Sequence, residues 1–140
     1  MLHVLAYSST ADSKFNQRDR NKIIDISVIN NKIFGVTGLL CYRERNFIQF
    51  LEGEQSVVQG LYKKIKRDSR HTRIFTMWDE PIKKRVFDTW SMALRNVDDF
   101  EGPTKDILVD LFELNLDRKI EGHVRLVELL LDMFRRRPLK

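Results

Sequence analysis

Strand-like apolar runs alternate with amphipathic helical segments along the first two thirds of the chain, and this order constrains the fold more than any other feature. A first helical segment follows Gln17 and gathers isoleucines on one face, and a second spans residues 57–67 with lysines opposite its apolar face. The remaining apolar runs are short and bounded by polar or turn residues, which is typical of strands. The predicted strands are residues 2–7, 36–42, 47–52, 74–78 and 86–94.

The predicted order of elements is therefore βαββαββ. Right-handed crossovers then favour a ferredoxin-like α+β fold, with a five-stranded mixed sheet and two helices on one face. Many unrelated functions use this scaffold, so the fold alone does not assign one.

After Gly102 and Pro103 the pattern becomes purely helical, which predicts a C-terminal helical extension. We expect a sheet domain over residues 1–96 and an extension over residues 97–140 that serves as a relay or in oligomerisation. The last predicted helix, residues 119–136, carries apolar side chains over more of its circumference than one sheet face requires. This surplus predicts a second contact surface and makes a homo-oligomer a hypothesis.

Composition fits one compact domain. The 140 residues, 42% of them hydrophobic, suffice for a single core. No stretch reaches the roughly 20 apolar residues of a membrane span, and residues 1–9 lack a signal-peptide pattern, so a cytoplasmic location without membrane contact is expected. The net charge of +5 comes from 25 basic residues interleaved with 20 acidic ones, so charge alone indicates no anionic partner. Cys41 is the only cysteine and cannot form an internal disulfide.

Motifs for hydrolytic, metal and nucleotide-triphosphate chemistry are missing from the sequence. The histidines His3, His71 and His123 form no HExxH motif. There is also no paired-cysteine spacing, no GxSxG turn and no glycine-rich phosphate loop. We therefore expect a protein that is not an enzyme and holds no metal.

Three polar side chains stand in apolar surroundings: Tyr7 at the end of the first strand, Asn31 after the isoleucine-rich helix, and Gln49 within FIQFL. Burying an amide without a hydrogen bond costs about 1 to 3 kcal/mol, so these groups need partners. For any one of them, an exposed side chain or a satisfied core amide is a sufficient explanation. Taken together, they indicate a planar polar ligand.

These residues belong to motifs that recur in one known family. The motifs are LAYSS with Tyr7, Asn31 six residues before Thr37 in GVTGLLCY, FIQFLEG with Gln49, RDSRH with Arg70 and His71, and WSM with Trp90 and Met92. In their order and spacing, over roughly residues 2–95, the sequence resembles the BLUF domain, the blue-light sensor that uses flavin.

The resemblance implies a non-covalently bound flavin between the two helices, usually FAD, with FMN or riboflavin as alternatives. It implies that Asn31 hydrogen-bonds the carbonyl and N3 edge of the ring, with Asn30 nearby, and that Phe47 lines the pocket together with Gln49. The residues implied to sandwich the ring are Ile23, Ile24 and Ile65. Those matching positions near the ribityl chain and phosphate are Lys64, Asp68, Arg70 and His71; the cationic ones suit a phosphate, and a solvated basic helix face is the alternative explanation.

The resemblance also implies a photochemical mechanism. Tyr7 gives an electron and a proton to the excited flavin by way of Gln49, whose amide offers both a donor and an acceptor. The glutamine is left rotated, tautomerised or both. Ser27, Trp90 and Met92 match signalling positions, although core packing would also explain Trp90, and a backbone hydrogen bond would explain a helical Ser27.

Two positions depart from the family pattern, because Arg20 replaces an apolar residue and Lys22 an acidic one. These departures predict altered packing of the first helix and retained flavin binding. With no catalytic output in the sequence, the signal is expected to leave through a separate downstream protein partner or a change in oligomeric state.

A single-stranded RNA or other nucleic-acid-binding module on the same scaffold is the alternative function. The aromatic string that such modules carry on a central strand is missing, so we do not expect nucleic acid as a partner. A flavin-dependent redox enzyme is a second alternative, but no substrate acid, base or nicotinamide site accompanies the flavin residues.

Overall fold

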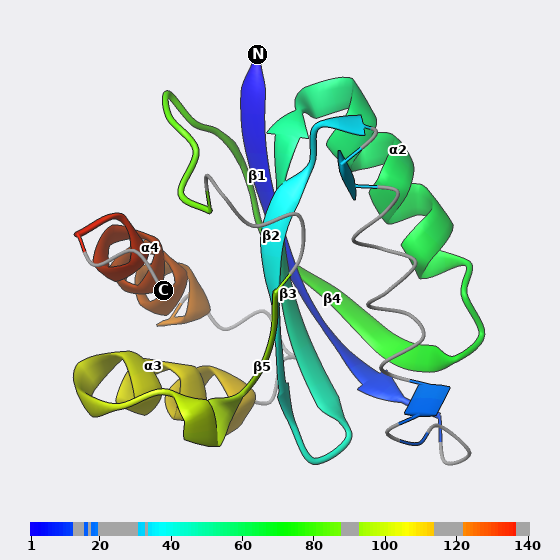
Figure 1. The fold of residues 1–140 in the computed structure, drawn as a ribbon. Coiled ribbons are helices and arrows are strands. Elements are labelled where there is room, and N and C mark those ends of the chain that lie inside the picture. Colours follow the sequence, from blue (N-terminus) through cyan, green and yellow to red (C-terminus); the bar gives the residue numbers. More distant parts are fainter. Residues whose placement is uncertain are drawn as a thin grey trace.

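A five-stranded mixed sheet forms the centre of the molecule (Figure 1). The computed structural model describes residues 1–12, 16, 18–19, 31–32, 34–87, 93–113 and 122–136, so most of the predicted first helix lies outside the described residues. The strands run in the order β4-β1-β3-β2-β5, antiparallel throughout except for the parallel pair β2 and β5. This topology confirms the predicted ferredoxin-like α+β class.

The elements have the following bounds: β1 (Leu2–Ala11), β2 (Thr37–Arg43), β3 (Asn46–Glu54), α2 (Gln55–Lys66), β4 (His71–Pro81), β5 (Ala93–Asn96), the short 3₁₀ helix η1 (Val97–Asp99), α3 (Gly102–Glu113) and α4 (Gly122–Arg136).

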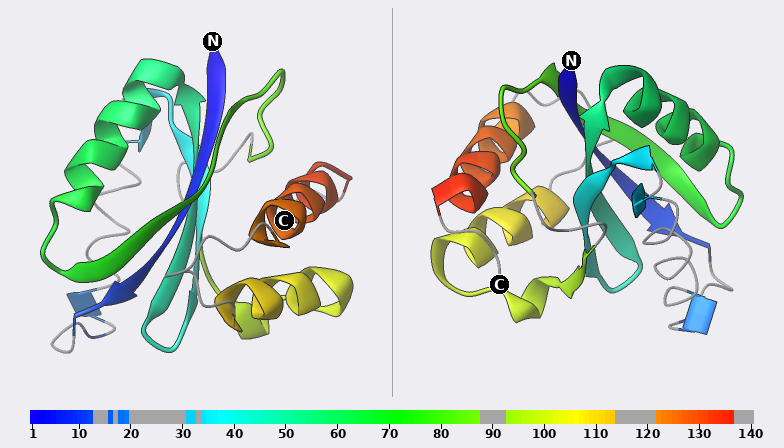
Figure 2. Two further views of the ribbon diagram at one scale, coloured as in Figure 1. Left: turned by 180° about the vertical axis from the view of Figure 1, so that it is seen from behind. Right: turned by 45° about the horizontal axis from the view of Figure 1, so that its top comes forward.

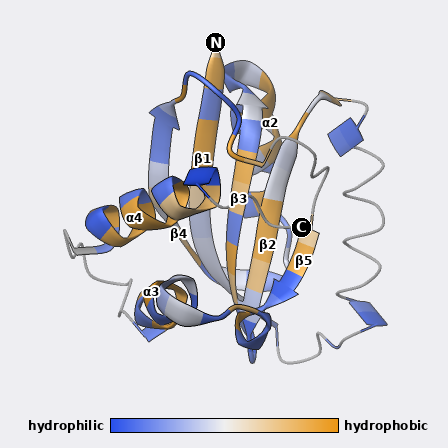
Figure 3. Cartoon of the chain, turned by 60° about the vertical axis from the view of Figure 1, so that its left-hand side comes forward, coloured by the Kyte–Doolittle hydropathy of each residue, from blue (hydrophilic) through white to orange (hydrophobic). Residues whose placement is uncertain are grey.

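Alternation along the strands gives the sheet two buried faces. Helix α2 lies on one face, and α3 and α4 lie on the other (Figures 1 and 2). On β3, residues 47, 49 and 51 point to the α2 face, and residues 48 and 50 point to the α3/α4 face. Apolar residues are concentrated along the central strands β1, β3 and β2 (Figure 3). The sheet therefore separates two cores that share its strands.

Helix α4 uses most of its apolar surface inside the molecule. Val127, Leu130 and Phe134 are at most 3% exposed and pack in one core with the sheet and α3. The Phe134 ring lies 6.1 Å from that of Phe50 on β3, and Val124, at 41% exposure, is the large apolar side chain of the helix that faces solvent. The second contact surface expected from the sequence thus includes α3 within the same chain, and oligomerisation stays a prediction.

Several predicted boundaries were wrong. Residues 8–11, of which the first three are polar, belong to β1, because pairing with β3 on one side and β4 on the other extends this central strand beyond its predicted end. The predicted last strand began too early: Val86 and Phe87 lie in a bend, and β5 is described from Ala93. Their backbone N–H groups donate to the side chain of Glu52 instead of to a strand.

Within the described part of the chain, no helix has both the length and the apolar character needed to cross a membrane.

Candidate functional site

A hydrogen-bonded tyrosine–glutamine pair lies at the middle of the α2 face. Tyr7 on β1 and Gln49 on β3 are direct partners in the antiparallel register, so their side chains emerge side by side on one face. The Tyr7 hydroxyl donates to Gln49 Oε1. Tyr7 is 4% exposed and Gln49 is 7% exposed, so the bond is shielded from water. The structure therefore brings together two residues that lie 42 positions apart in the sequence.

The buried environment keeps the Tyr7 phenol protonated. Burial raises the pKa of Tyr7 far above its ordinary value of 10.0, and the nearby Tyr62 and Asp68 raise it further. At neutral pH the phenol therefore holds its proton and donates it in the bond to Gln49. Loss of an electron from this ring would make the proton strongly acidic, so electron and proton transfer from Tyr7 would be coupled.

Two aromatic rings, those of Tyr62 and His71, lie beside Tyr7 on the α2 face of the sheet. The Tyr62 ring of α2 lies 5.2 Å from the Tyr7 ring at an interplanar angle of 33°, and the His71 ring lies 6.3 Å away edge-on. Tyr62 shares a 2.6 Å hydrogen bond with Thr76 on β4, and Lys66 Nζ lies 4.7 Å from the centre of its ring. These contacts hold the Tyr62 ring beside that of Tyr7.

Asn31 lies in a helical turn that ends at Gly35, and it is 3% exposed. The Val36 N–H donates to the Asn31 carbonyl at 2.8 Å, and Gly35 between them has φ +69°, the left-handed conformation that commonly ends a helix. A side chain at Gly53 on β3 would come within 3.2 Å of the Gly35 carbonyl. Glycine at both positions thus lets the end of this turn pack against β3.

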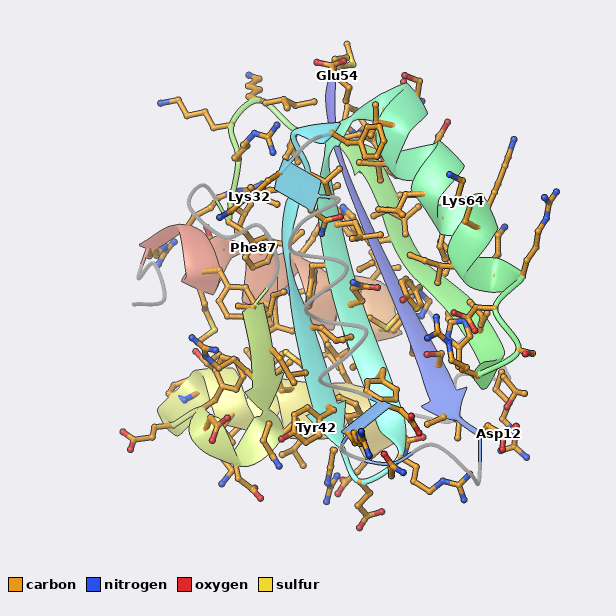
Figure 4. All side chains as sticks on the ribbon, turned by 45° about the vertical axis from the view of Figure 1, so that its right-hand side comes forward. Asp12, Lys32, Tyr42, Glu54, Lys64 and Phe87 are labelled. Atoms are coloured by element: carbon orange, nitrogen blue, oxygen red, sulfur yellow. The ribbon has the colours of Figure 1, made fainter. Side chains whose placement is uncertain are left out.

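The cationic residues predicted near a phosphate differ in their surroundings. The Arg70 Nε–H donates to both carboxylate oxygens of Asp68, at 2.8 and 2.9 Å, and this pairing holds the pKa of Asp68 down at about 2. His71 Nε2–H donates to the Ile65 carbonyl at 2.6 Å, which orients its ring beside Tyr7. Lys64 is exposed on α2 (Figure 4), and no described ion pair engages it. Asp68 and Arg70 therefore form one unit, and Lys64 is the separate cation.

Six predicted site residues lie outside the described residues. They are Ile23, Ile24, Ser27, Asn30, Trp90 and Met92, and the departures from the family pattern at Arg20 and Lys22 lie outside as well. Phe47 is buried in the same core as Tyr7, and Ile65 is partly buried against it.

A buried carboxylate that the sequence analysis did not single out lies on the opposite face of β3. Glu52 is fully buried and accepts hydrogen bonds from the Thr37 hydroxyl at 2.7 Å, the Val86 N–H at 2.8 Å and the Phe87 N–H at 2.7 Å. Burial raises the pKa of Glu52 above its ordinary value, although these hydrogen bonds and the nearby Arg85 oppose that shift.

The donor set of the α2 face suits the ligand that the resemblance implies. An isoalloxazine ring is planar and apolar on its faces, and carries carbonyl and N–H groups along one edge. The amides of Asn31 and Gln49 each offer a donor and an acceptor, which matches such an edge. Leu40, Phe47 and Ile65 supply apolar surface beside them. The residues present therefore fit a flavin.

The fold and this site define a flavin-binding sensor domain. The profile of the BLUF family, described as sensors of blue-light using FAD, matches residues 2–93, and the chain belongs to this family. It is accordingly a blue-light sensor that uses flavin.

Relatives and solved structures agree with this assignment. The chain is 33% identical over 93 residues to "Photoactivated adenylate cyclase subunit beta" of Euglena longa, covering 66% of this chain and 11% of that protein. It thus spans about a tenth of that relative. Among solved structures, "BlrB - a BLUF protein, dark state structure" is 28% identical with a TM-score of 0.71, covering 91% of this chain and 96% of the other. "BlsA photo-activated state" is 25% identical with a TM-score of 0.77, covering 96% and 94%.

Proposed function

We propose that Tyr7 and Gln49 are the photochemical pair of this sensor. The observation that carries the proposal is the buried hydrogen bond from the Tyr7 hydroxyl to Gln49 Oε1. When bound, an excited flavin supplies the acceptor for one electron and one proton. Tyr7 supplies both, and Gln49 supplies the path because its amide accepts from the phenol and donates with its NH₂ group.

The return of the electron and proton to Tyr7 leaves Gln49 free to settle with its amide rotated or tautomerised. Either outcome replaces the acceptor that faces Tyr7 with a donor. A stable change in hydrogen bonding therefore follows from light without any covalent product.

We assign the holding of the flavin to Asn31 at the ring edge, with Phe47 and Ile65 beside the ring and Lys64 toward a phosphate. The exposed Lys64 ammonium suits the diphosphate of FAD by charge, and FMN and riboflavin are the alternatives that a binding comparison separates. Asp68, Arg70 and His71 orient this end of α2 and β4 through the hydrogen bonds described above.

Strand β3 offers a route for the signal across the sheet. Gln49 points to the α2 face, while the next residue, Phe50, points to the other face and packs 5.6 Å from Phe87 and 6.1 Å from Phe134 of α4, measured between ring centres. We propose that α3 and α4 present the altered state to a separate protein partner or a second copy. The chain itself is proposed to carry no catalysis.

Absorption spectroscopy tests the proposal. Purified protein supplied with FAD should be yellow, and blue light should shift its absorption reversibly to the red. A protein that binds no flavin, or whose bound flavin shows no such shift, contradicts the proposal.

A further inference from the structure

We propose that Arg85 and Glu52 form a clasp that joins the end of the Asn31 turn to residues 86–87, and that breaking this clasp is part of the light response. The proposal rests on the function proposed above. It assigns positioning roles to two residues that do not touch the flavin site.

Glu52 holds the first half of the clasp. Its carboxylate is fully buried, and a buried charge persists only where hydrogen bonds compensate it. Two of its three donors are the consecutive N–H groups of Val86 and Phe87, and the third is the Thr37 hydroxyl on β2. One side chain thus fixes the segment that leads toward β5 to two strands of the sheet.

Arg85 holds the second half. Its guanidinium donates to the Gly35 carbonyl at 2.7 Å, to Thr37 Oγ1 at 2.9 Å and to the Glu52 carbonyl at 3.4 Å. Gly35 is the left-handed residue that ends the turn containing Asn31. The planar, forked guanidinium can reach three acceptors at fixed angles, which a lysine ammonium at the end of a flexible stem cannot reproduce.

The two halves form one continuous hydrogen-bonded path. It starts at the turn that holds Asn31 on the flavin side, passes through Gly35 to Arg85, and continues through Thr37 to Glu52. It ends at the backbone of Phe87, whose side chain lies across the sheet toward α4 (Figure 4). Such a path can transmit a change only if it has two arrangements, joined and broken.

Strand β3 connects this path to the photochemical pair. Gln49 and Glu52 are on the same strand, and Thr37 is the direct partner of Glu52 in the β2–β3 register. A new hydrogen-bonding arrangement at Gln49 alters how β3 sits against β1 and the Asn31 turn. Such a shift would strain the clasp first among the polar contacts on the α3/α4 face of the sheet. The reason is that Arg85 binds acceptors on β2, on β3 and at the end of the Asn31 turn.

A clasp that is joined in the dark and broken in the light stabilises the dark state selectively. A contact shifts a two-state equilibrium only through its preference for one state, so weakening the clasp lowers the stability of the dark state relative to the lit state. The recovery of the dark state from the lit state should therefore slow. For Arg85→Met we expect dark recovery to slow about tenfold, with the size of the red shift unchanged. Lys84→Met removes the same charge from the preceding, exposed position of the same segment and should recover at the wild-type rate.

Hydrogen exchange gives a readout that does not depend on the spectrum. The amides of Val86 and Phe87 should exchange slowly in wild-type protein in the dark and faster under blue light. In Arg85→Met they should exchange fast in both conditions, and in Lys84→Met they should behave as in the wild type. Thr37→Val, which removes only the hydroxyl shared by the two halves, provides a second variant if Arg85→Met does not fold.

The outcomes separate the two proposals. A wild-type protein without a red shift contradicts the proposed photochemistry, and the dark exchange rates then still decide whether Arg85 holds residues 86–87. A normal red shift together with unchanged recovery and unchanged exchange in both Arg85→Met and Thr37→Val overturns the clasp alone. A purely structural role would lower thermal stability equally in dark and light and leave the recovery rate unaltered, which would also overturn it.

Discussion

The hydrogen bond between Tyr7 and Gln49 should appear as a coupling energy in a double-mutant cycle. Tyr7→Phe removes the donor of the hydrogen bond, and Gln49 keeps other interactions in this variant. We therefore expect the free energy of unfolding to fall by about 1 kcal/mol. Gln49→Leu removes the acceptor of a fully buried phenol and should cost about 1 to 3 kcal/mol. In the double variant both groups are apolar, so the second substitution should cost less than it does alone. The expected coupling energy is about 1 to 2 kcal/mol.

Urea denaturation in the dark, at saturating flavin, measures the four corners of this cycle. If thermal unfolding is measured instead of urea denaturation, the same coupling energy corresponds to a difference of roughly 3 to 8 °C in melting temperature for a chain of this size. As a control, Tyr7→Phe combined with Glu113→Gln should be additive, because Glu113 pairs with Arg43 in an exposed surface contact far from the site. Additivity of Tyr7→Phe and Gln49→Leu within about 0.5 kcal/mol would refute the hydrogen bond.

Three further predictions follow from other contacts. The pKa of Asp68 is lowered to about 2 from 3.8, so its pairing with Arg70 stabilises the fold above pH 3.8, and this stabilisation is lost as the pH falls toward 2. Because both groups are partly exposed, the contribution is about 1 kcal/mol. The free energy of unfolding of Asp68→Asn should lack this pH dependence, and a pH profile identical to that of the wild type would argue against the pair. Lys64→Ala should weaken FAD binding about tenfold in a fluorescence titration and leave riboflavin binding unaltered, and equal effects on both flavins would remove Lys64 from the phosphate. Phe134→Ala should lower the free energy of unfolding by about 3 to 5 kcal/mol, because its ring is 3% exposed and packs against Phe50, and a near-zero cost would show that α4 does not cover the sheet.

Sequence patterns predicted the fold class, which the sheet topology confirms, and singled out Tyr7 and Gln49 as polar groups in need of partners. Tyr7 and Gln49 are polar groups within apolar strands, and polar groups buried in that way need partners. Their direct pairing could not be predicted from the patterns, because register depends on which residues of β1 and β3 meet across the sheet.

The misplaced boundaries have a common cause. Residues 8–10 carry no apolar signal, yet they remain in β1 because strands on both sides satisfy their backbone groups. Val86 and Phe87 carry a strand-like signal, yet Glu52 takes their N–H groups. In both cases a tertiary contact overrides local preference.

The clasp had no local signal in the sequence. A glutamate at the end of an apolar run indicates the solvated end of a strand, and Arg85 lies among lysines that indicate an exposed loop. The one available hint is alternation, because Glu52 occupies the inward phase set by Ile48 and Phe50. Its partners come from segments 15 and 34 residues away, and only the fold brings them together.

The central claim is that Tyr7 supplies the electron and proton in the light reaction, and the blue-light difference spectrum of Tyr7→Phe tests it most directly. The variant keeps the ring and the buried volume, so it should bind flavin and remain yellow. It should show no red shift. Tyr62→Phe, which removes the hydroxyl of the neighbouring tyrosine, is the matched control and should shift as the wild type does. A Tyr7→Phe protein that shifts reversibly to the wild-type extent would contradict the account.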